Sequence, residues 1–206
     1  DDMPYELGLV SAILPEVETV LVDYSSRDFI EQIKGFFPYE ESGERNRTML
    51  YREQKEREKK RIHCKSVEEY NASLQTVMTC EKAAASQAKR LSELSHRTNR
   101  FNLAGTRYSE KEISDMLLNP DYQVVSLEIS DIYGDMGIVG MGVLHQNCIE
   151  GFMISCRVFD RGLEEVLLQK LQTLSNGPLV GFYQPNDKNK AYANFYPDHG
   201  VTIHEL

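Results

Sequence analysis

The stretch that decides the fold is residues 122–174, which read YQVVSLEISDIYGDMGIVGMGVLHQNCIEGFMISCRVFDRGLEEVLLQKLQTL. Residues 122–129, 137–144 and 148–158 are rich in apolar and β-branched side chains, and short turns separate them, which is typical of consecutive strands. Short connections of this kind join antiparallel neighbours. Residues 162–174 then repeat leucine at helical spacing, which predicts an amphipathic helix. The stretch therefore predicts an antiparallel meander whose last strand leads into a helix.

The same alternation of strands and helices continues on both sides of this meander, from residue 75 to the last residue. The best marked helix start is Ser109 with Glu112 three residues later, which is a capping box. The order β-α-α-β-β-β-α-β-α-β predicts an α/β domain with a mixed, mostly antiparallel sheet flanked by helices. The remaining predicted elements are strands over 76–80, 179–183 and 201–203 and helices over 83–94, 109–118 and 188–196.

Residues 1–40 predict an α-β-α fragment that precedes this domain. Pro4 suits the first turn of a helix that ends before Pro15. Residues 18–22 are rich in β-branched side chains and predict a strand, and a second helix begins after Ser26. Because a lone strand needs a sheet to join, we interpret the fragment as the tail of a larger, Rossmann-like domain.

Residues 41–74 predict a helical connector. The segment 42–65 is dense in charge, and opposite signs recur four positions apart, as in Glu53 with Arg57, which supports an exposed helix. A basic helix that binds nucleic acid or a partner is the alternative, but interleaved acids favour a solvated connector. A shorter helix follows around 67–74. We therefore expect three parts, at 1–40, 41–74 and 75–206.

Composition limits the classes of function. The formal net charge of −9 argues against nucleic-acid binding, which needs a positive surface. No apolar run reaches the roughly 18 residues of a membrane span, and no signal peptide is visible. The four cysteines show no CxxC spacing, which fits a reduced, cytoplasmic setting. Because the first residue is Asp1 rather than Met, we expect further chain upstream.

Five ordered segments carry a family resemblance: DDMPYE at 1–6, RTNRFN at 97–102, RY at 107–108, DIYGDMGIVG at 131–140 and SCRVFDRGLEE at 155–165. Together they resemble the C-terminal half of FkbH-like proteins, which belong to subfamily IIIC of the HAD phosphatase superfamily. The order of elements from residue 75 resembles the GNAT acyltransferase fold. The resemblance therefore implies a GNAT-like domain preceded by the tail of a HAD domain.

This family resemblance implies a two-part protein. Its HAD half would dephosphorylate a phosphoglyceryl donor and load a glyceryl unit on an acyl carrier protein. Asp1 and Asp2 would correspond to the last acidic motif of that half and would supply Mg²⁺ ligands only in an intact HAD domain. The chain lacks the HAD nucleophile motif Asp-x-Asp-x-Thr/Val, so we expect no phosphatase chemistry from it. The expected partners are an acyl carrier protein or acyl-CoA, and the missing HAD domain.

The resemblance also implies a cofactor site at the turn before residues 162–174. In the GNAT fold, backbone N–H groups at this helix start hold the phosphates of coenzyme A (CoA) or of a phosphopantetheine thioester. Glu164 and Val166 stand where that fold has small residues, and Glu164 would repel a pyrophosphate. Arginines suit forked phosphate recognition, with salt bridges to Asp160, Glu164 or Glu165 as the alternative. The residues expected to contact the cofactor are Arg157, Arg161, Gly162, Leu163 and Asn189.

Three side chains are candidates for catalysis. Cys156 would be a thiol nucleophile activated by the helix start and the neighbouring arginines, and the alternative is a small core residue. Tyr196 would protonate the departing thiolate, or else pack at a helix end. Asp135, like Asp131, would serve as an acid, a base or a metal ligand, whereas the alternative is a local role in a turn.

An acceptor site is expected after the first helix of the domain, where the GNAT fold lines its acceptor cleft. The residues expected to bind substrate are Thr98, Asn99, Phe101 and Asn102, with helix capping and a core phenylalanine as the alternative. These features predict a domain that binds a thioester and assists transfer of a small acyl or glyceryl unit to or from a carrier-protein thiol. Two alternatives stay open: an independent acyl-CoA-dependent N- or O-acyltransferase, and a non-catalytic module that docks a carrier protein.

Overall fold

The computed structural model describes residues 3–17, 19–23 and 47–205, and the chain falls into two compact units, residues 1–47 and 48–206. In the first unit the described residues form a helix, α1 (Pro4–Ile13), with Pro4 in its first turn as predicted. The predicted strand over 18–22 is wrong where the structure describes it, because residues 19–22 join no sheet and an isolated strand is not stable. The helix predicted after Ser26 lies outside the described residues.

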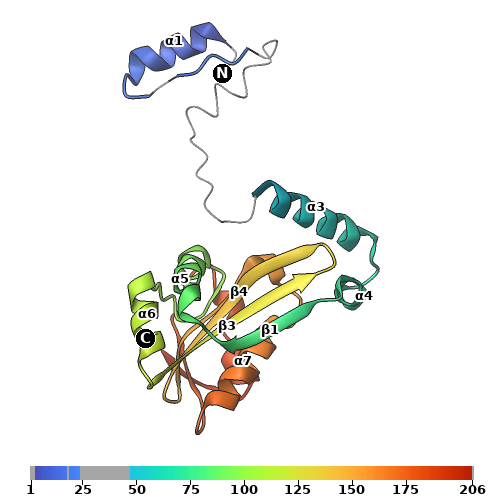
Figure 1. The fold of residues 1–206 in the computed structure, drawn as a ribbon, viewed down its shortest axis with the longest axis vertical. Coiled ribbons are helices and arrows are strands. Elements are labelled where there is room, and N and C mark those ends of the chain that lie inside the picture. The colour runs from blue at the N-terminus through green and yellow to red at the C-terminus, as the bar shows by residue number, and fades with distance from the viewer. Residues whose placement is uncertain (1–2, 18, 24–46, 206) are drawn as a thin grey trace. The chain divides into compact units, whose positions relative to one another are not determined.

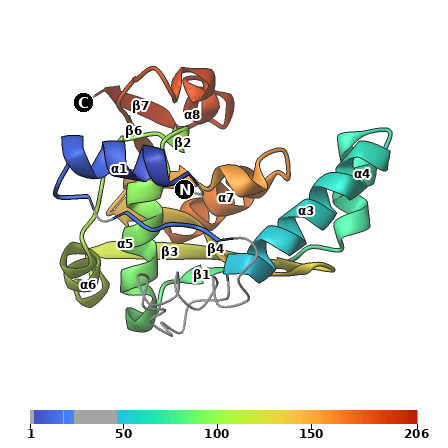
Figure 2. The same cartoon turned by 90° about the horizontal axis from the view of Figure 1, so that it is seen from above.

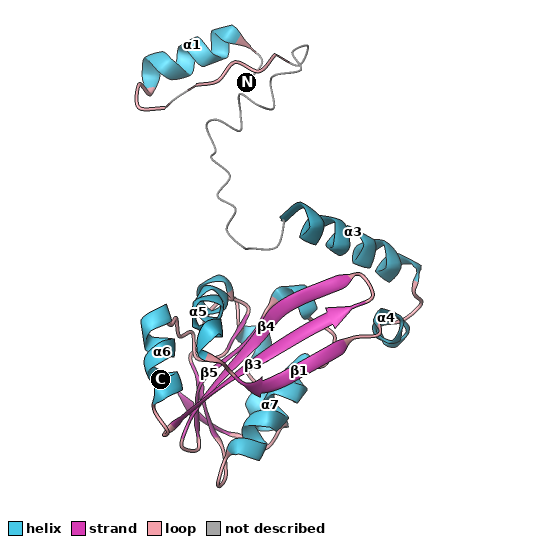
Figure 3. Cartoon of the chain, in the orientation of Figure 1, coloured by secondary structure: helices cyan, strands magenta, loops and turns pink. Residues whose placement is uncertain are grey.

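The second unit is built on one mixed sheet (Figures 1 and 3). Among the described residues its strands run in the order β1-β3-β4-β5-β6-β7, with the short β2 beside β5. The pairs from β1 to β5 are antiparallel, whereas β5–β6 and β6–β7 are parallel. This confirms the predicted mixed, mostly antiparallel sheet. The strands are β1 (Val77–Lys82), β2 (Phe101–Asn102), β3 (Tyr122–Asp131), β4 (Gly134–His145), β5 (Cys148–Ile154), β6 (Val180–Tyr183) and β7 (Thr202–Glu205).

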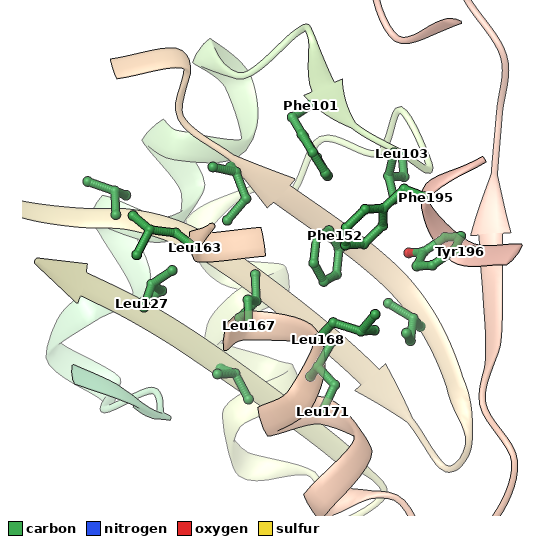
Figure 4. Close-up of a cluster of buried hydrophobic side chains, with 14 of the residues drawn as sticks. Phe101, Leu103, Leu127, Phe152, Leu163, Leu167, Leu168, Leu171, Phe195 and Tyr196 are labelled. Atoms are coloured by element: carbon green, nitrogen blue, oxygen red, sulfur yellow. The ribbon is translucent and has the colours of Figure 1, made fainter. Parts of the chain in front are cut away.

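Helices pack on both faces of this sheet. Side chains of α5 (Ala88–Arg97) and α6 (Glu110–Leu118) form one apolar cluster, and side chains of α7 (Leu163–Leu174) form part of another, shown in Figure 4. Successive strand residues point to opposite faces, so Val124 lies in the first cluster and Val125 in the second. This alternation fixes the face of the sheet on which each helix packs.

Several predicted elements are shorter than expected. The strand predicted over 148–158 ends at Ile154, because the Ser155 hydroxyl accepts the N–H of Arg157 and turns the chain into a 3-10 helix, η2 (Cys156–Val158). The predicted helices over 83–94 and 188–196 also begin or break as 3-10 turns. These regions contain η1 (Ala85–Gln87) before α5, and η3 (Lys190–Tyr192) before α8 (Phe195–Asp198).

The charged segment forms α3 (Arg47–His63), followed by α4 (Val67–Leu74). Figures 1 and 2 show α3 beside the tip of the β3–β4 hairpin. Most of α3 is exposed, as predicted, but the Arg57 side chain is only 2% exposed and pairs with Asp131 at the hairpin tip. Arg57 therefore departs from the predicted solvated connector, and residues 48–74 lie in the same compact unit as the sheet.

Candidate functional site

The turn that joins β5 to α7 places the predicted nucleophile at the surface. Cys156 lies in η2, one residue beyond the Ser155 cap, and its side chain is exposed. The expected strand position and the alternative core role are both wrong for Cys156, because the chain leaves the sheet before it. Two residues of the same turn, Asp160 and Gly162, have left-handed φ angles of 64° and 67°.

Arg157 is the arginine of this turn whose guanidinium has no acidic neighbour. It donates to the Ser155 hydroxyl over 3.3 Å and to the Met136 carbonyl over 3.5 Å. Within the described residues, no carboxylate oxygen lies within 4.0 Å of it. Burial lowers the pKa of Arg157, and the positive charge of Arg90 lowers it further. A half-buried cation of this kind favours a bound anion.

Arg161, four residues later, has a different environment. Its side chain is 5% exposed and donates to the Asp131 carboxylate over 3.2 Å. The same carboxylate accepts two hydrogen bonds from Arg57, at 2.7 and 2.8 Å. Burial would raise the pKa of Asp131, but the two arginines and the Tyr133 N–H hold it below its ordinary value. The predicted cofactor role of Arg161 is corrected by this buried ion pair, which uses Asp131 and not the acids beside Arg161 in the sequence.

The start of α7 is acidic. Glu164 and Glu165 lie in its first turn, and Gly162 at the N-cap position contributes no side-chain cap. Burial raises the pKa of Glu164, and the charges of Glu165 and Asp160 add to that rise. Leu163 is 1% exposed and belongs to the core, so its predicted contact with a cofactor is corrected to a packing role. The negative charges at the start of α7 would therefore repel a phosphate group bound there.

Tyr196 lies inside the apolar cluster, not at a site (Figure 4). Its side chain is 1% exposed, and its ring lies against Phe152 with 6.0 Å between centroids. The hydroxyl is buried and has no hydrogen-bond partner among the described residues. Burial raises the pKa of Tyr196 well above its usual value. The predicted role of Tyr196 as a proton donor to a thiolate is corrected, because its hydroxyl is closed off from any ligand at the surface.

Tyr192, one turn before Tyr196, is a better placed phenol that the sequence reasoning missed. Its half-buried ring contacts Phe101 at 4.2 Å and Phe159 at 5.8 Å between centroids. Burial raises its pKa, and Cys156 is among the groups whose charge influences it. The signal available in the sequence was the tyrosine in Asn-Lys-Ala-Tyr, ahead of the Phe-Tyr pair that drew the prediction.

Asn189 is buried, and its side chain hydrogen-bonds to β2 and to the loop after β6. It is 0% exposed, and its amide donates to the carbonyls of Asn102 and Gln184 over 3.1 and 2.9 Å. Its side-chain oxygen accepts the N–H of Asn186 over 2.8 Å. With these groups occupied, the predicted cofactor contact of Asn189 is corrected to a structural role that ties the loop after β6 to β2.

The predicted acceptor segment is mostly internal as well. Thr98, Phe101 and Asn102 are 5%, 2% and 1% exposed, so their predicted contact with substrate is corrected to packing. Asn99 is exposed, but its side-chain oxygen accepts a hydrogen bond from Arg107 over 2.7 Å. Arg107 also donates to the Ser95 and Thr98 carbonyls at the end of α5. The end of α5 is therefore bound by Arg107 and not by an asparagine, while Phe101 packs in the core.

Within the described residues, the acidic candidates form no metal site. Asp135 is exposed and accepts the Gly137 N–H over 2.8 Å, which is the local turn role. In the part of the chain that the structure describes, no three His, Cys, Asp or Glu side chains gather as metal ligands would. Asp1 and Asp2 lie outside that part. None of the described helices is long and apolar enough to cross a bilayer.

Cys156 and Arg157 are consecutive residues of η2, the first exposed and the second half-buried, and Tyr192 packs against Phe159 of the same turn. A pocket of about 320 Å³ opens near the same turn, but it is lined by Asn71, Arg161 and Leu163 and their neighbours rather than by these groups. The candidate site is therefore an open surface site. Such a site can hold an anion at the guanidinium and present a thiol and a phenol beside it.

Comparisons with known proteins add a likeness at low identity. No family model matches this chain, and no curated protein matches it. Among solved structures, the chain is similar to a crystal structure of an acetyltransferase from Trypanosoma brucei, at 19% sequence identity and a TM-score of 0.45. The likeness covers 63% of this chain and 96% of that one.

Proposed function

We propose that the sheet unit binds a phosphopantetheine thioester and assists transfer of a small acyl or glyceryl unit to or from a carrier-protein thiol. The observation that carries the proposal is the half-buried guanidinium of Arg157, which has no carboxylate partner among the described residues and lies next to the exposed thiol of Cys156. A forked guanidinium is suited to a phosphate. A pantetheine arm held by its phosphate would bring its thioester to the thiol.

The charges around this turn favour a single phosphate over the pyrophosphate of CoA. Asp160, Glu164 and Glu165 crowd the start of α7, and their mutual repulsion contributes to the raised pKa of Glu164. A second phosphate at this helix start would meet the same repulsion. A carrier-protein arm, which has one phosphate, therefore fits the turn better than acyl-CoA does.

In the proposed reaction, Cys156 is the nucleophile and Tyr192 the proton donor. The Cys156 thiolate attacks the thioester carbonyl. A new carbon–sulfur bond forms, the bond to the pantetheine sulfur breaks, and the departing thiolate takes the Tyr192 proton. A second carrier thiol then takes the acyl unit by the same attack and returns its proton to Tyr192. A tyrosine phenol has an ordinary pKa of about 10 and is therefore protonated at neutral pH.

A non-catalytic docking module is the second candidate function. It is favoured by the open surface and by the acidic start of α7, which together give binding without an enclosed reaction site. An acyl-CoA-dependent N- or O-acyltransferase is disfavoured by the same acids. In either favoured case the partners are a carrier protein and an upstream HAD domain in the cytoplasm, with Mg²⁺ confined to that upstream domain.

Binding of 4′-phosphopantetheine is the first test. Isothermal calorimetry would compare it with pantetheine, which lacks the phosphate, and with CoA. We expect 4′-phosphopantetheine to bind best and Arg157→Gln to weaken it at least about tenfold, because a charge-assisted hydrogen bond is lost. Arg52→Gln, an exposed arginine of α3, is the matched control. Equal binding of the phosphate-free compound, or unchanged binding by Arg157→Gln, would contradict the proposal.

Turnover separates the two candidate functions. Acyl-pantetheine is supplied with a carrier thiol, and thioester exchange is followed by mass spectrometry. Loss of exchange in Cys156→Ser and Tyr192→Phe, with binding retained, supports catalysis. Binding without exchange in the unaltered protein supports the docking module.

A further inference from the structure

The segment α3–α4 holds the turn that leads into α7. Arg61 of α3 pairs with the Asp160 carboxylate over 2.9 Å. Asn71 of α4 donates to the Asp160 backbone carbonyl over 2.7 Å. Two residues that lie 99 and 89 positions upstream therefore contact one residue of the turn, through its side chain and its backbone together.

Asp160 is the residue of this turn that needs such support. Its φ of 64° is left-handed, a conformation that costs free energy for a residue with a Cβ, although aspartate and asparagine adopt it more readily than most. Gly162 nearby has a similar φ of 67° without the same penalty. The contacts from Arg61 and Asn71 therefore support the left-handed conformation of Asp160.

The same segment is anchored next to the turn by a buried ion pair. Arg57 of α3 binds the Asp131 carboxylate, which also accepts a hydrogen bond from Arg161. Arg57 donates in addition to the Gly134 carbonyl over 3.2 Å. These contacts hold α3 against the hairpin tip. Arg61 and Asn71 are thereby kept within reach of Asp160.

We propose that Arg61 and Asn71 are positioning residues, which hold Asp160 in its left-handed conformation and thereby keep Arg157 and Cys156 arranged for the thioester arm. This inference rests on the proposed function for its ligand. It gives α3–α4 a role in binding although neither helix contributes a residue to the candidate site.

The test first removes the two contacts and then asks whether a second substitution restores the affinity for 4′-phosphopantetheine. The double variant Arg61→Met, Asn71→Ala removes both contacts. We expect it to bind 4′-phosphopantetheine about tenfold more weakly, because the turn then leaves the left-handed conformation. Adding Asp160→Gly in that background should restore affinity to within about threefold of the unaltered protein, because glycine adopts the conformation without help. Lys55→Met, an exposed lysine on α3, is the control.

A ligand-free measurement keeps this inference separate from the proposed function. Hydrogen exchange of the amides of residues 157–165, read by mass spectrometry, should rise in the double variant and fall again with Asp160→Gly. If the unaltered protein binds no pantetheine compound, the proposed function fails, and the exchange pattern still decides whether α3–α4 holds the turn. Unchanged exchange and affinity in the folded double variant, or failure of Asp160→Gly to restore them, would overturn the inference.

Discussion

Single side chains with the same chemistry have different roles in this fold because of their surroundings. Arg157 and Arg161 belong to one turn, yet Arg161 is buried against Asp131 while Arg157 has no carboxylate neighbour among the described residues. Tyr192 and Tyr196 repeat the pattern, with one phenol half-buried against Phe159 of the turn and the other enclosed. Residue type therefore selected the candidate side chains, and burial decided which arginine and which tyrosine are accessible.

The buried hydroxyl of Tyr196 leads to a stability prediction. Because it has no hydrogen-bond partner among the described residues, Tyr196→Phe removes an unsatisfied polar group. We expect the free energy of unfolding to rise by about 1 kcal/mol, with 4′-phosphopantetheine binding unchanged. Urea denaturation and calorimetry measure both quantities. A loss of thioester exchange in Tyr196→Phe, with Tyr192→Phe active, would restore Tyr196 as the proton donor.

Helices and strands with strong local patterns formed where the sequence predicted them. The capping box of Ser109 and Glu112 opens α6, and the leucine repeat forms α7. Weak elements depended on their neighbours: β5 ended where Ser155 capped a 3-10 turn, and residues 19–22 formed no strand. Gly142 of β4 allows α7 to pack closely on the sheet, because a Cβ at this position would come within 2.9 Å of Leu171.

The contact of β6 with α8 gives a second prediction. A Cβ built on Gly181 would overlap the Tyr196 ring, and this ring is buried and cannot swing away. We expect Gly181→Ala to lower the free energy of unfolding by about 1–3 kcal/mol, as overpacking does. Gly177→Ala is the control, because its Cβ would meet only the Asn147 amide at 3.2 Å. Equal stability of the two variants would show that the strand and helix separate at little cost.

Across the sheet unit as a whole, one buried carboxylate connects distant parts of the chain. Asp131 ends β3, and it binds Arg57 of α3 and Arg161 before α7. The predicted connector is thereby joined to the sheet and to the candidate site. Removing one member of a buried ion pair leaves uncompensated charge, which costs more than the pair itself contributes.

Asp131→Asn should therefore destabilise the protein in a pH-dependent way. We expect a loss of about 3 kcal/mol at pH 7. The lowered pKa of Asp131 means that its stabilisation is complete above the unfolded value of roughly 3.9 and disappears as the pH falls through the folded value. The difference between the variant and the unaltered protein should shrink below about pH 4. Urea denaturation at several pH values measures it.

Asp187→Asn is the control for that pH series, because Asp187 is 95% exposed and its pair with Lys190 lies in solvent. Its effect should stay near zero at every pH. A loss in Asp131→Asn that does not vary with pH would mean that the side chain contributes through packing and not through its charge.

The order of strands and helices from residue 75 could be read from the sequence, because periodicity and capping act over a few residues at a time. The sequence also places one cysteine and two arginines in the turn before α7, and their role toward a thioester is a proposal. Tertiary structure alone decided the rest. The partners of Asp131 lie 74 and 30 positions away, and the contacts to Asp160 come from 99 and 89 positions away. Which arginine is paired, which tyrosine is buried and what α3 holds in place all follow from such distant contacts, because burial and charge pairing arise only when the chain is folded.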